Sequence, residues 1–309
     1  MEIYSVERLT AANIGRLVYL YKEVFNQKIT VNFLLQKYDT KIFGTEFIGF
    51  IALTQSNLPM AFYGVIPCLV QWEGKVILAA QSSDTMTHPN FQRQGLFHTL
   101  AMKTYALAKE NGIQFIFGFP NQNSYPGFVK LQWQFTTNAL QLFKLNTGIP
   151  GFGNWMSRIP ILKQVYNQYI RRMLGVHNFQ FIEVFQPDFT YGIKHDSLFL
   201  DYKGYHKTYF KKIENGLLWL KVEGKLHIGF AKLKNSPTPI FFIRKLKWLA
   251  ISLGCKEVVL MTSKNSELYN LLSQHVQPSD AFPVGFYNLS HEPFAFEKMH
   301  FEYCDLDIF

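Results

Sequence analysis

The sequence predicts a mixed α/β protein with two consecutive units, each a mixed central sheet flanked by helices. Three observations carry this prediction. A strand, a short glycine-containing loop and a helix follow one another between Lys75 and Asn111. Two helices and a strand meander precede this helix and another strand follows it, which is the element order of a sheet covered by helices. The same order returns, more weakly, 142 residues later.

Hydrophobic spacing predicts the individual elements. Apolar residues three and four apart indicate helices over 9–25, where Thr10 is the expected cap, and over 31–37. Runs rich in β-branched and aromatic residues, bounded by turn residues, indicate strands. These strands are expected over 45–53, 60–72, 75–87, 113–120 and 135–145.

The run from Asp84 to Phe97 joins the end of a strand to the start of a helix. Its loop, Gln92-Arg93-Gln94-Gly95-Leu96-Phe97, is basic and contains glycine. A loop that opens a helix presents unpaired backbone N–H groups and the positive end of the helix dipole. Such a loop can hold a phosphate or pyrophosphate, and glycine lets the backbone approach that ligand closely.

This run resembles the acyl-CoA loop of the GNAT family of N-acetyltransferases, Gln/Arg-x-x-Gly-x-Gly/Ala. Only the last position departs from the pattern, because Phe97 replaces a small residue. A second stretch, Asn123-Ser124 followed by 127–133, resembles the family's Asn, small residue and aromatic-x-Lys-Leu-Gly-Phe helix. The resemblance implies a GNAT fold and acyl transfer from acetyl-CoA to an amine.

The resemblance also implies which residues contact the acyl-CoA. The strand end is expected to pair with the pantetheine arm, the loop to bind the pyrophosphate and two asparagines to reach the pantetheine amides. Asn123 suits a helix cap equally well. The set is Thr85, Met86, Thr87, Gln92, Arg93, Gln94, Gly95, Leu96, Phe97, Asn121 and Asn123. Backbone N–H groups beside the strand end can stabilise the tetrahedral oxyanion.

Acyl transfer to an amine needs a base for the acceptor proton. Asp84 is the first candidate, because it lies on the strand that leads into the loop, and a structural carboxylate is the alternative interpretation. Glu46, on an early strand, is the second candidate, and His88 is the third, although a turn residue is the simpler interpretation there. Strand alternation puts Asp84 and Met86 on one face and Ser83 on the other.

The same reaction needs an acid for the CoA thiolate. The family commonly uses a tyrosine where this chain has Phe128, which cannot donate a proton. Tyr125 lies three residues earlier, about one helical turn, and is the expected acid. A bound water is the alternative.

A glycine- and proline-containing stretch at 147–153 marks the expected domain boundary. We predict a catalytic acyl-CoA-binding domain over 1–148, a connecting helix over 149–178 and a degenerate second copy over 179–309. The connecting helix is basic, so a helix on a membrane surface is the alternative to a packed connector.

The second copy is not expected to bind the cofactor. Asn235-Ser236-Pro237-Thr238-Pro239 stands opposite the loop at 93–97, and proline has no N–H to donate. We expect this copy to complete the acceptor cleft or a dimer contact instead.

Composition limits the class of protein. The 309 residues are 48% hydrophobic and 17% charged, which indicates a globular chain. The net charge of +9 is scattered, which favours an anionic cofactor over nucleic acid. Three dispersed cysteines and the lack of a leader pattern indicate a reducing cytoplasm. No metal-ligand spacing, Ser-His-Asp order or membrane-spanning run is present in the sequence.

These observations predict an N-acetyltransferase that moves an acetyl or other short acyl group from acyl-CoA to a primary amine of a small molecule. We expect a cytoplasmic monomer or homodimer with no metal, nucleic acid or membrane partner. The aromatic content of 17% suits an amino-sugar acceptor, and suits an ordinary core equally. Two alternatives stay open: a Fem-like aminoacyltransferase that uses charged tRNA, and a non-catalytic acyl-CoA-binding or scaffold protein, which Phe128 would suit.

Overall fold

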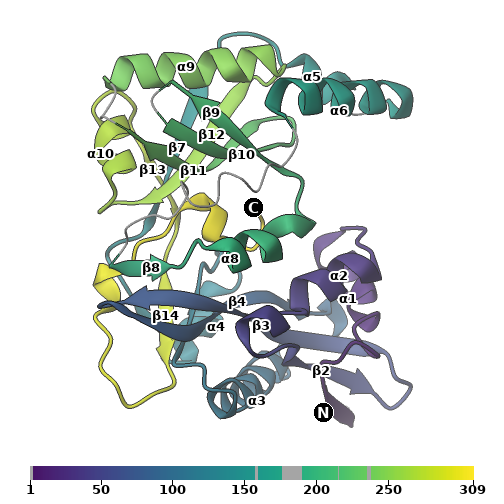
Figure 1. Ribbon diagram of the computed structural model, residues 1–309. Coiled ribbons are helices and arrows are strands. Elements are labelled where there is room, and N and C mark those ends of the chain that lie inside the picture. Colours follow the sequence, from purple (N-terminus) through teal and green to yellow (C-terminus); the bar gives the residue numbers. More distant parts are fainter. Residues whose placement is uncertain (1–2, 157–158, 176–189, 215, 235–237) are drawn as a thin grey trace.

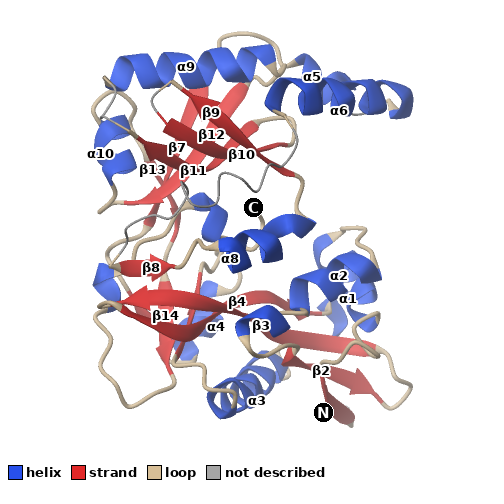
Figure 2. Ribbon diagram, viewed as in Figure 1, coloured by secondary structure: helices blue, strands red, loops and turns tan. Residues whose placement is uncertain are grey.

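A computed structural model describes residues 3–156, 159–175, 190–214, 216–234 and 238–309. Two sheets lie one above the other, and a long helix covers the outer side of each (Figure 1). The last residues of the chain run between the two sheets. Figure 2 shows the helices and strands of both layers.

The first sheet has eight strands in the order β1-β2-β3-β4-β5-β14-β6, with β8 paired to β3. The strands β1 to β4 are antiparallel, whereas β4 and β5 are parallel. The bounds are β1 Tyr4–Arg8, β2 Ile48–Thr54, β3 Pro59–Trp72, β4 Lys75–Thr87, β5 Phe115–Gly118, β6 Gln134–Phe135, β8 Tyr191–Ile193 and β14 Gly285–Asn288.

Helices cover both faces of this sheet. On one face lies α3, Leu96–Glu110, whose apolar stripe packs with α4, Tyr125–Lys130, over the strands. On the other face lie α1, Arg16–Phe25, and α2, Val31–Tyr38, which share a second core with β2, β3 and β4.

The second sheet has six strands in the order β13-β7-β12-β11-β10-β9. Its strands are β7 Leu140–Asn146, β9 Thr208–Ile213, β10 Gly216–Val222, β11 Leu226–Leu233, β12 Glu257–Ser263 and β13 Ser279–Phe282. Its helices are α5 Phe152–Met156, α6 Pro160–Leu174, α9 Pro239–Ser252 and α10 Glu267–Ser273. The helix α8, Ser197–Tyr202, lies between the two sheets (Figure 1).

The predicted internal repeat is present as two equivalent strand–helix–strand units. In the first, β4 and β5 are parallel and α3 connects them; in the second, β11 and β12 are parallel and α9 connects them. A short helix follows each unit, α4 in the first and α10 in the second. The fold is therefore a mixed α/β fold with two tandem units of the same topology, as the sequence predicts.

The two sheets exchange strands. β7 precedes residue 148 but lies in the second sheet between β12 and β13. β14 comes from the last part of the chain but lies in the first sheet between β5 and β6. Each sheet thus takes an inner strand from the other half, and the division between the sheets does not coincide with the boundary expected at residue 148.

Some expected elements differ at their ends. The first helix begins at Arg16, because Thr10 and Asn13 exchange side-chain-to-backbone hydrogen bonds in a preceding turn and compete with the helix. The expected strand over 135–145 divides into β6 and β7, and the expected connecting helix divides into α5 and α6. The sequence prediction missed β1. None of the helices in the described residues is long and apolar enough to cross a bilayer.

Candidate active site

The centre of the site is a bulge in β4. The ladder between β4 and β5 has two pairs, Ala80–Ile116 and Gln81–Phe117, and stops there. Two residues of β4, Asp84 and Thr85, then oppose a single residue of β3. Asp84 takes the left-handed conformation, with φ of +53°. The bulge interrupts strand alternation, so Ser83 and Asp84 reach one polar network and do not point to opposite faces as expected.

Both carboxylate oxygens of Asp84 have partners from α2. The Lys37 ammonium lies 2.8 Å from Oδ1 and 2.8 Å from Oδ2, and the Tyr38 hydroxyl donates to Oδ2 at 2.7 Å. The side chains of Lys37 and Asp84 are only 4% and 9% exposed, so this ion pair is buried. A buried charge needs such partners, because its hydration is lost.

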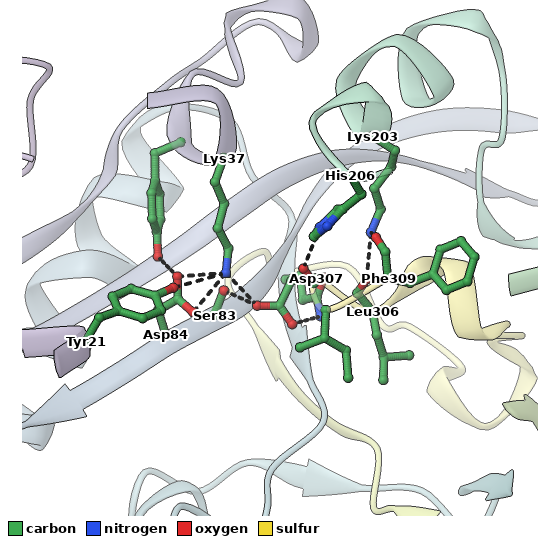
Figure 3. A network of polar contacts seen from close by, with 12 residues as sticks. Tyr21, Lys37, Ser83, Asp84, Lys203, His206, Leu306, Asp307 and Phe309 are labelled. Atoms are coloured by element: carbon green, nitrogen blue, oxygen red, sulfur yellow. Dashed lines mark hydrogen bonds and ion pairs between the residues drawn. The ribbon is translucent and has the colours of Figure 1, made fainter. Parts of the chain in front are cut away.

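A second carboxylate shares the same ammonium. Asp307, near the end of the described chain, accepts from Lys37 Nζ at 2.9 Å and from the Ser83 hydroxyl (Figure 3). The sequence separation between Lys37 and Asp307 is 270 residues. Residues from α2, β4 and the C-terminal segment therefore meet in one network.

The electrostatics of the network favour its charged forms. Burial alone would lower the pKa of Lys37, but Asp307 and Asp84 together hold that pKa well above its usual value. Burial would likewise raise the pKa of Asp307, yet Lys37 and the Ser83 hydroxyl hold it below its usual value. Burial first, and then the Asp84 charge, raises the pKa of Tyr38, which therefore stays a hydrogen-bond donor.

The predicted anion loop has the expected geometry. Arg93 and Gly95 both take positive φ, +63° and +78°, and Gly95 is the residue before α3. Within the described residues, the backbone N–H groups of 92–98 have no protein acceptor. These N–H groups and the positive end of α3 are therefore available to an anion.

Packing explains the unusual Phe97. Its ring lies against Gly127 of α4, where an added Cβ would come within 2.8 Å of the ring, and it packs edge-on against Tyr63 and Phe128. Phe128 is 3% exposed and fills the space between α3 and Trp133. The aromatic residues at 97 and 128 form one packed cluster under the loop.

The turn before α4 is held by Asn121. Its side-chain oxygen accepts from the N–H groups of Asn123 and Ser124 at 2.9 and 3.0 Å, so Asn121 caps this turn and Asn123 does not. Tyr125 is the first residue of α4 and is 38% exposed, with its ring against Phe135. Thr85 and Thr87 are partly buried on β4, and Met86 is buried under α1 and α2.

The other candidate bases lie elsewhere. Glu46 precedes β2 and is not on a strand, because β2 begins at Ile48. Partial burial first, and then the Asp39 carboxyl, raises the pKa of Glu46. His88 lies in a turn. Its Nδ1 accepts from Asn90 N–H, and its ring stacks on Tyr19, which agrees with the interpretation of His88 as a turn residue.

Sequence reasoning missed the partners of Asp84. Lys37 lies on the buried face of α2 beside Leu34 and Tyr38, and a lysine at such a position is a signal for a buried carboxylate partner. Asp307 has no comparable signal, because its distance to α2 depends on the whole fold. The loop at 235–237 lies outside the described residues, so the expectation drawn from it stays a prediction.

One group of potential metal ligands exists among the described residues, although the sequence spacing suggested none. His195, Cys304 and Asp305 are all buried and their ligand atoms lie close together. His195 Nε2 is 2.5 Å from Asp305 Oδ1, which is a hydrogen-bonding distance. The pair suits a buried histidine–aspartate bond.

Known proteins share this architecture. Residues 5–135 match the model of the acetyltransferase (GNAT) domain. A protein of Enterococcus faecalis V583 described as a probable N-acyltransferase has a TM-score of 0.58 at 13% identity over 93% of this chain and 73% of its own. A GCN5-related N-acetyltransferase of Anabaena variabilis has a TM-score of 0.57 at 12% identity, over 93% and 73%.

A third structure extends the comparison. A GCN5-related glucosamine N-acetyltransferase region of a fungal multi-domain GH3 β-N-acetylglucosaminidase has a TM-score of 0.56 at 10% identity, and the match covers 93% of this chain and 38% of that one. No curated protein matches the sequence. At these identities the structural likeness concerns the fold, and it includes both sheets.

The bulged strand, the loop at 92–97 and the first strand–helix–strand unit all lie within the residues that match this family model. Residues 5–135 of this chain match a GNAT-family acetyltransferase domain, which is the domain of an N-acyltransferase. The resemblance in the loop and in the stretch at 123–133 is thereby confirmed. The family implies an acyl-CoA cosubstrate and an amine acceptor.

Proposed function

We propose that this chain transfers an acetyl or other short acyl group from acyl-CoA to a primary amine of a small molecule. The observation that carries the proposal is the loop at 92–97, whose N–H groups lack protein acceptors in the described residues and sit at the start of α3. In this proposal residues 1–148 supply the loop and the bulge, 149–178 connect, and 179–309 carry the degenerate copy, with β7 and β14 exchanged between the two sheets.

The cosubstrate would lie along the edge of β4. The loop holds the pyrophosphate, and the backbone of 85–87, beyond the last pair with β5, accompanies the pantetheine arm. This course brings the thioester to the bulge at Asp84. Backbone N–H groups beside the bulge can then stabilise the tetrahedral oxyanion, at ~10²–10³ in rate per donor.

Asp84 is the base that this arrangement favours, acting on the acceptor ammonium directly or through a water. Lys37 and Tyr38 occupy both oxygens of Asp84. For proton transfer, one of these hydrogen bonds must therefore break, or a water must join Asp84 to the acceptor ammonium. Glu46 is the second candidate. Tyr125, exposed at the start of α4, is the proposed acid for the CoA thiolate.

An amino sugar is the acceptor class we would screen first. The fungal region with the same fold is a glucosamine N-acetyltransferase, and the buried aromatic surroundings of the network include Tyr21, Tyr38 and Tyr202. A Fem-like use of charged tRNA has no supporting observation in the structure, since such an enzyme has no use for a pyrophosphate loop.

The test uses two matched glycine variants. Gly95 and Gly112 flank α3, have φ of +78° and +80°, and an added Cβ at either meets no atom within 4 Å. Gly95→Ala and Gly112→Ala therefore strain the backbone equally, by about 1–2 kcal/mol. Only the Cβ at residue 95 would project into the proposed pyrophosphate position.

We expect acetyl-CoA to raise the melting temperature of the native chain and of Gly112→Ala, but far less that of Gly95→Ala. Thiol release with a panel of amines, led by amino sugars, then tests turnover. Stabilisation without thiol release would favour the scaffold alternative. If millimolar acetyl-CoA shifts none of the three proteins, the proposed function is wrong.

A further inference from the structure

The network around Asp84 depends on a part of the chain that belongs to neither strand–helix–strand unit. This part is the C-terminal segment, residues 302–309, which runs between the sheets. It supplies Asp307, the second carboxylate on Lys37 Nζ. Figure 3 shows Asp307 between Lys37 and Ser83 on one side and His206 on the other.

Cationic and polar side chains of the second half fix this segment. Lys203 Nζ donates to the Leu306 carbonyl at 2.6 Å, and Lys221 Nζ donates to the Ile308 carbonyl at 3.0 Å. His206 Nε2 donates to the Asp307 carbonyl at 3.2 Å, in the tautomer that protonates Nε2. Lys203 and Lys221 are 3% and 7% exposed, so these hydrogen bonds are buried and strong.

An aromatic anchor completes the attachment. Phe309 is 1% exposed, and its ring lies against the backbone of Gly229 and edge-on to Trp219. Because the main chain is held on both sides of Asp307, its carboxylate has a defined position relative to β4. That position lies within hydrogen-bonding distance of Ser83 and Lys37.

We propose that Asp307 is a positioning residue for acyl transfer: it holds the Lys37 ammonium in place beside Asp84, so that the second half of the chain completes the site on β4. The proposal rests on the proposed function. One lysine ammonium is shared by two carboxylates, so neither is fully neutralised by it. Without Asp307, the Lys37 ammonium would have Asp84 as its single carboxylate partner in this network.

The pH dependence of turnover is the readout that a merely structural role would not move. Removing the negative charge at 307 takes away one of the two carboxylates that hold the Lys37 ammonium in its charged form, so the acidic limb of kcat/KM should shift. The titratable and charged groups that face Asp84 and Asp307 come from α1, α2, α8, the 3₁₀ turn at 203–205 and the residue after that turn: Tyr21, Lys37, Tyr38, Tyr202, Lys203, Tyr205 and His206. They are present in every variant below.

The experiment compares Asp307→Asn with Asp307→Glu and with Glu302→Gln. Glu302 is a matched control, because it is a buried carboxylate of the same segment that binds Thr262 and His300 in the second half. We expect Asp307→Asn to lower kcat about 10-fold and to shift the acidic limb, with KM for acetyl-CoA within about 2-fold. Asp307→Glu should restore part of kcat, and Glu302→Gln should keep the native profile.

A second readout does not need turnover. In chains labelled with ¹⁵N-lysine, the Lys37 ammonium should give an NMR signal protected from exchange in the native protein and in Glu302→Gln. In Asp307→Asn this signal should move or disappear. An unchanged signal, or native kcat and pH profile in folded Asp307→Asn, overturns the proposal. Absence of acyl-CoA binding and thiol release in the native chain would overturn the proposed function instead, and the ammonium signal would still decide the positioning role.

Discussion

The two strand–helix–strand units have one topology and two different uses. In the first, the loop before α3 leaves its N–H groups available, and β4 runs on beyond its last pair with β5. In the second, α9 begins with Thr238-Pro239, and β11 also runs on beyond its last pair with β12. There Phe309 of the C-terminal segment packs against Gly229 of β11. The repeated fold thus keeps its topology, although in the second unit the ring of Phe309 lies beside β11, at the place that corresponds to where we propose that the cofactor binds beside β4.

The largest expected effect comes from removing the Phe309 ring from its position against β11. Phe309→Ala removes a ring that is 1% exposed and should lower the free energy of unfolding by about 3–5 kcal/mol, because the cavity cannot close fully. Ile308→Ala is the control, since Ile308 is 52% exposed and its loss should cost no more than about 0.5 kcal/mol. Urea unfolding measures both. Equal losses in the two variants would contradict the role given to the ring.

The next effect concerns the number of ligands. If only the first unit binds the cofactor, one acyl-CoA should bind per chain, and at 100 times its dissociation constant it should add about 2.7 kcal/mol to the free energy of unfolding. Isothermal titration calorimetry gives the stoichiometry directly. Two molecules per chain would show that the second unit has kept its own site.

The third effect is a difference in acid stability between the two halves of the chain. Burial, and then Lys203, lowers the pKa of His206 to about 3, and burial lowers the pKa of His227 to about 4. Both folded values lie below the unfolded value of about 6.5, so the stability that these groups confer is present above pH 6.5 and is lost as pH falls towards 4.

Both histidines belong to the second half, so this loss should begin there. Hydrogen exchange followed by mass spectrometry, corrected for the intrinsic rate at each pH, should show β9–β11 opening before β2–β4 between pH 6.5 and 4.5. In His206→Gln this difference should shrink. Simultaneous opening of both sheets in the native chain would argue against separate acid sensitivity.

The smallest effect has opposite signs in the two copies. Gln132 is the residue after the C-cap of the first copy's short helix and has φ of +61°, whereas Gln274, 142 residues later, is the C-cap of α10 and has φ of −65°. Gln132→Gly relieves left-handed strain and should stabilise the chain by about 0.5–1 kcal/mol. Gln274→Gly only adds freedom to the unfolded chain and should destabilise it by a similar amount. The melting temperatures of the two variants test this prediction. A change of melting temperature in the same direction in both variants would contradict it.

Local sequence patterns predict those features of the two units that depend on interactions between residues close in the sequence. The loop at 92–97 and the helix after it depend on residues that are neighbours in the sequence, so the sequence predicts both. The helical pattern of α9 is likewise local, and its spacing from α3 reveals the repeat. The bulge at Asp84 was not, because alternation over 75–87 gives no sign of an extra residue. The expected strand over 45–53 includes Glu46, but β2 begins only at Ile48, so the expected start of this strand is wrong by three residues.

Long-range pairing set the limit for the rest. Lys37 and Asp307 meet only after both sheets have formed, and no spacing rule connects residues 270 apart. The exchange of β7 and β14 is of the same kind, because each strand has the composition of a strand in either sheet. Tertiary context chose its partner.

The exchanged strands also determine when the protein can be completed during synthesis. In an ordinary tandem protein the first domain folds while the second is still on the ribosome. Here β14, an inner strand of the first sheet, consists of residues 285–288, so that sheet stays open beside β5 until synthesis has passed residue 288. The loop at 92–97 is translated long before β14, which completes the sheet that supports it. A gene cut between the halves would therefore yield two incomplete sheets, each with an unpaired strand edge prone to association.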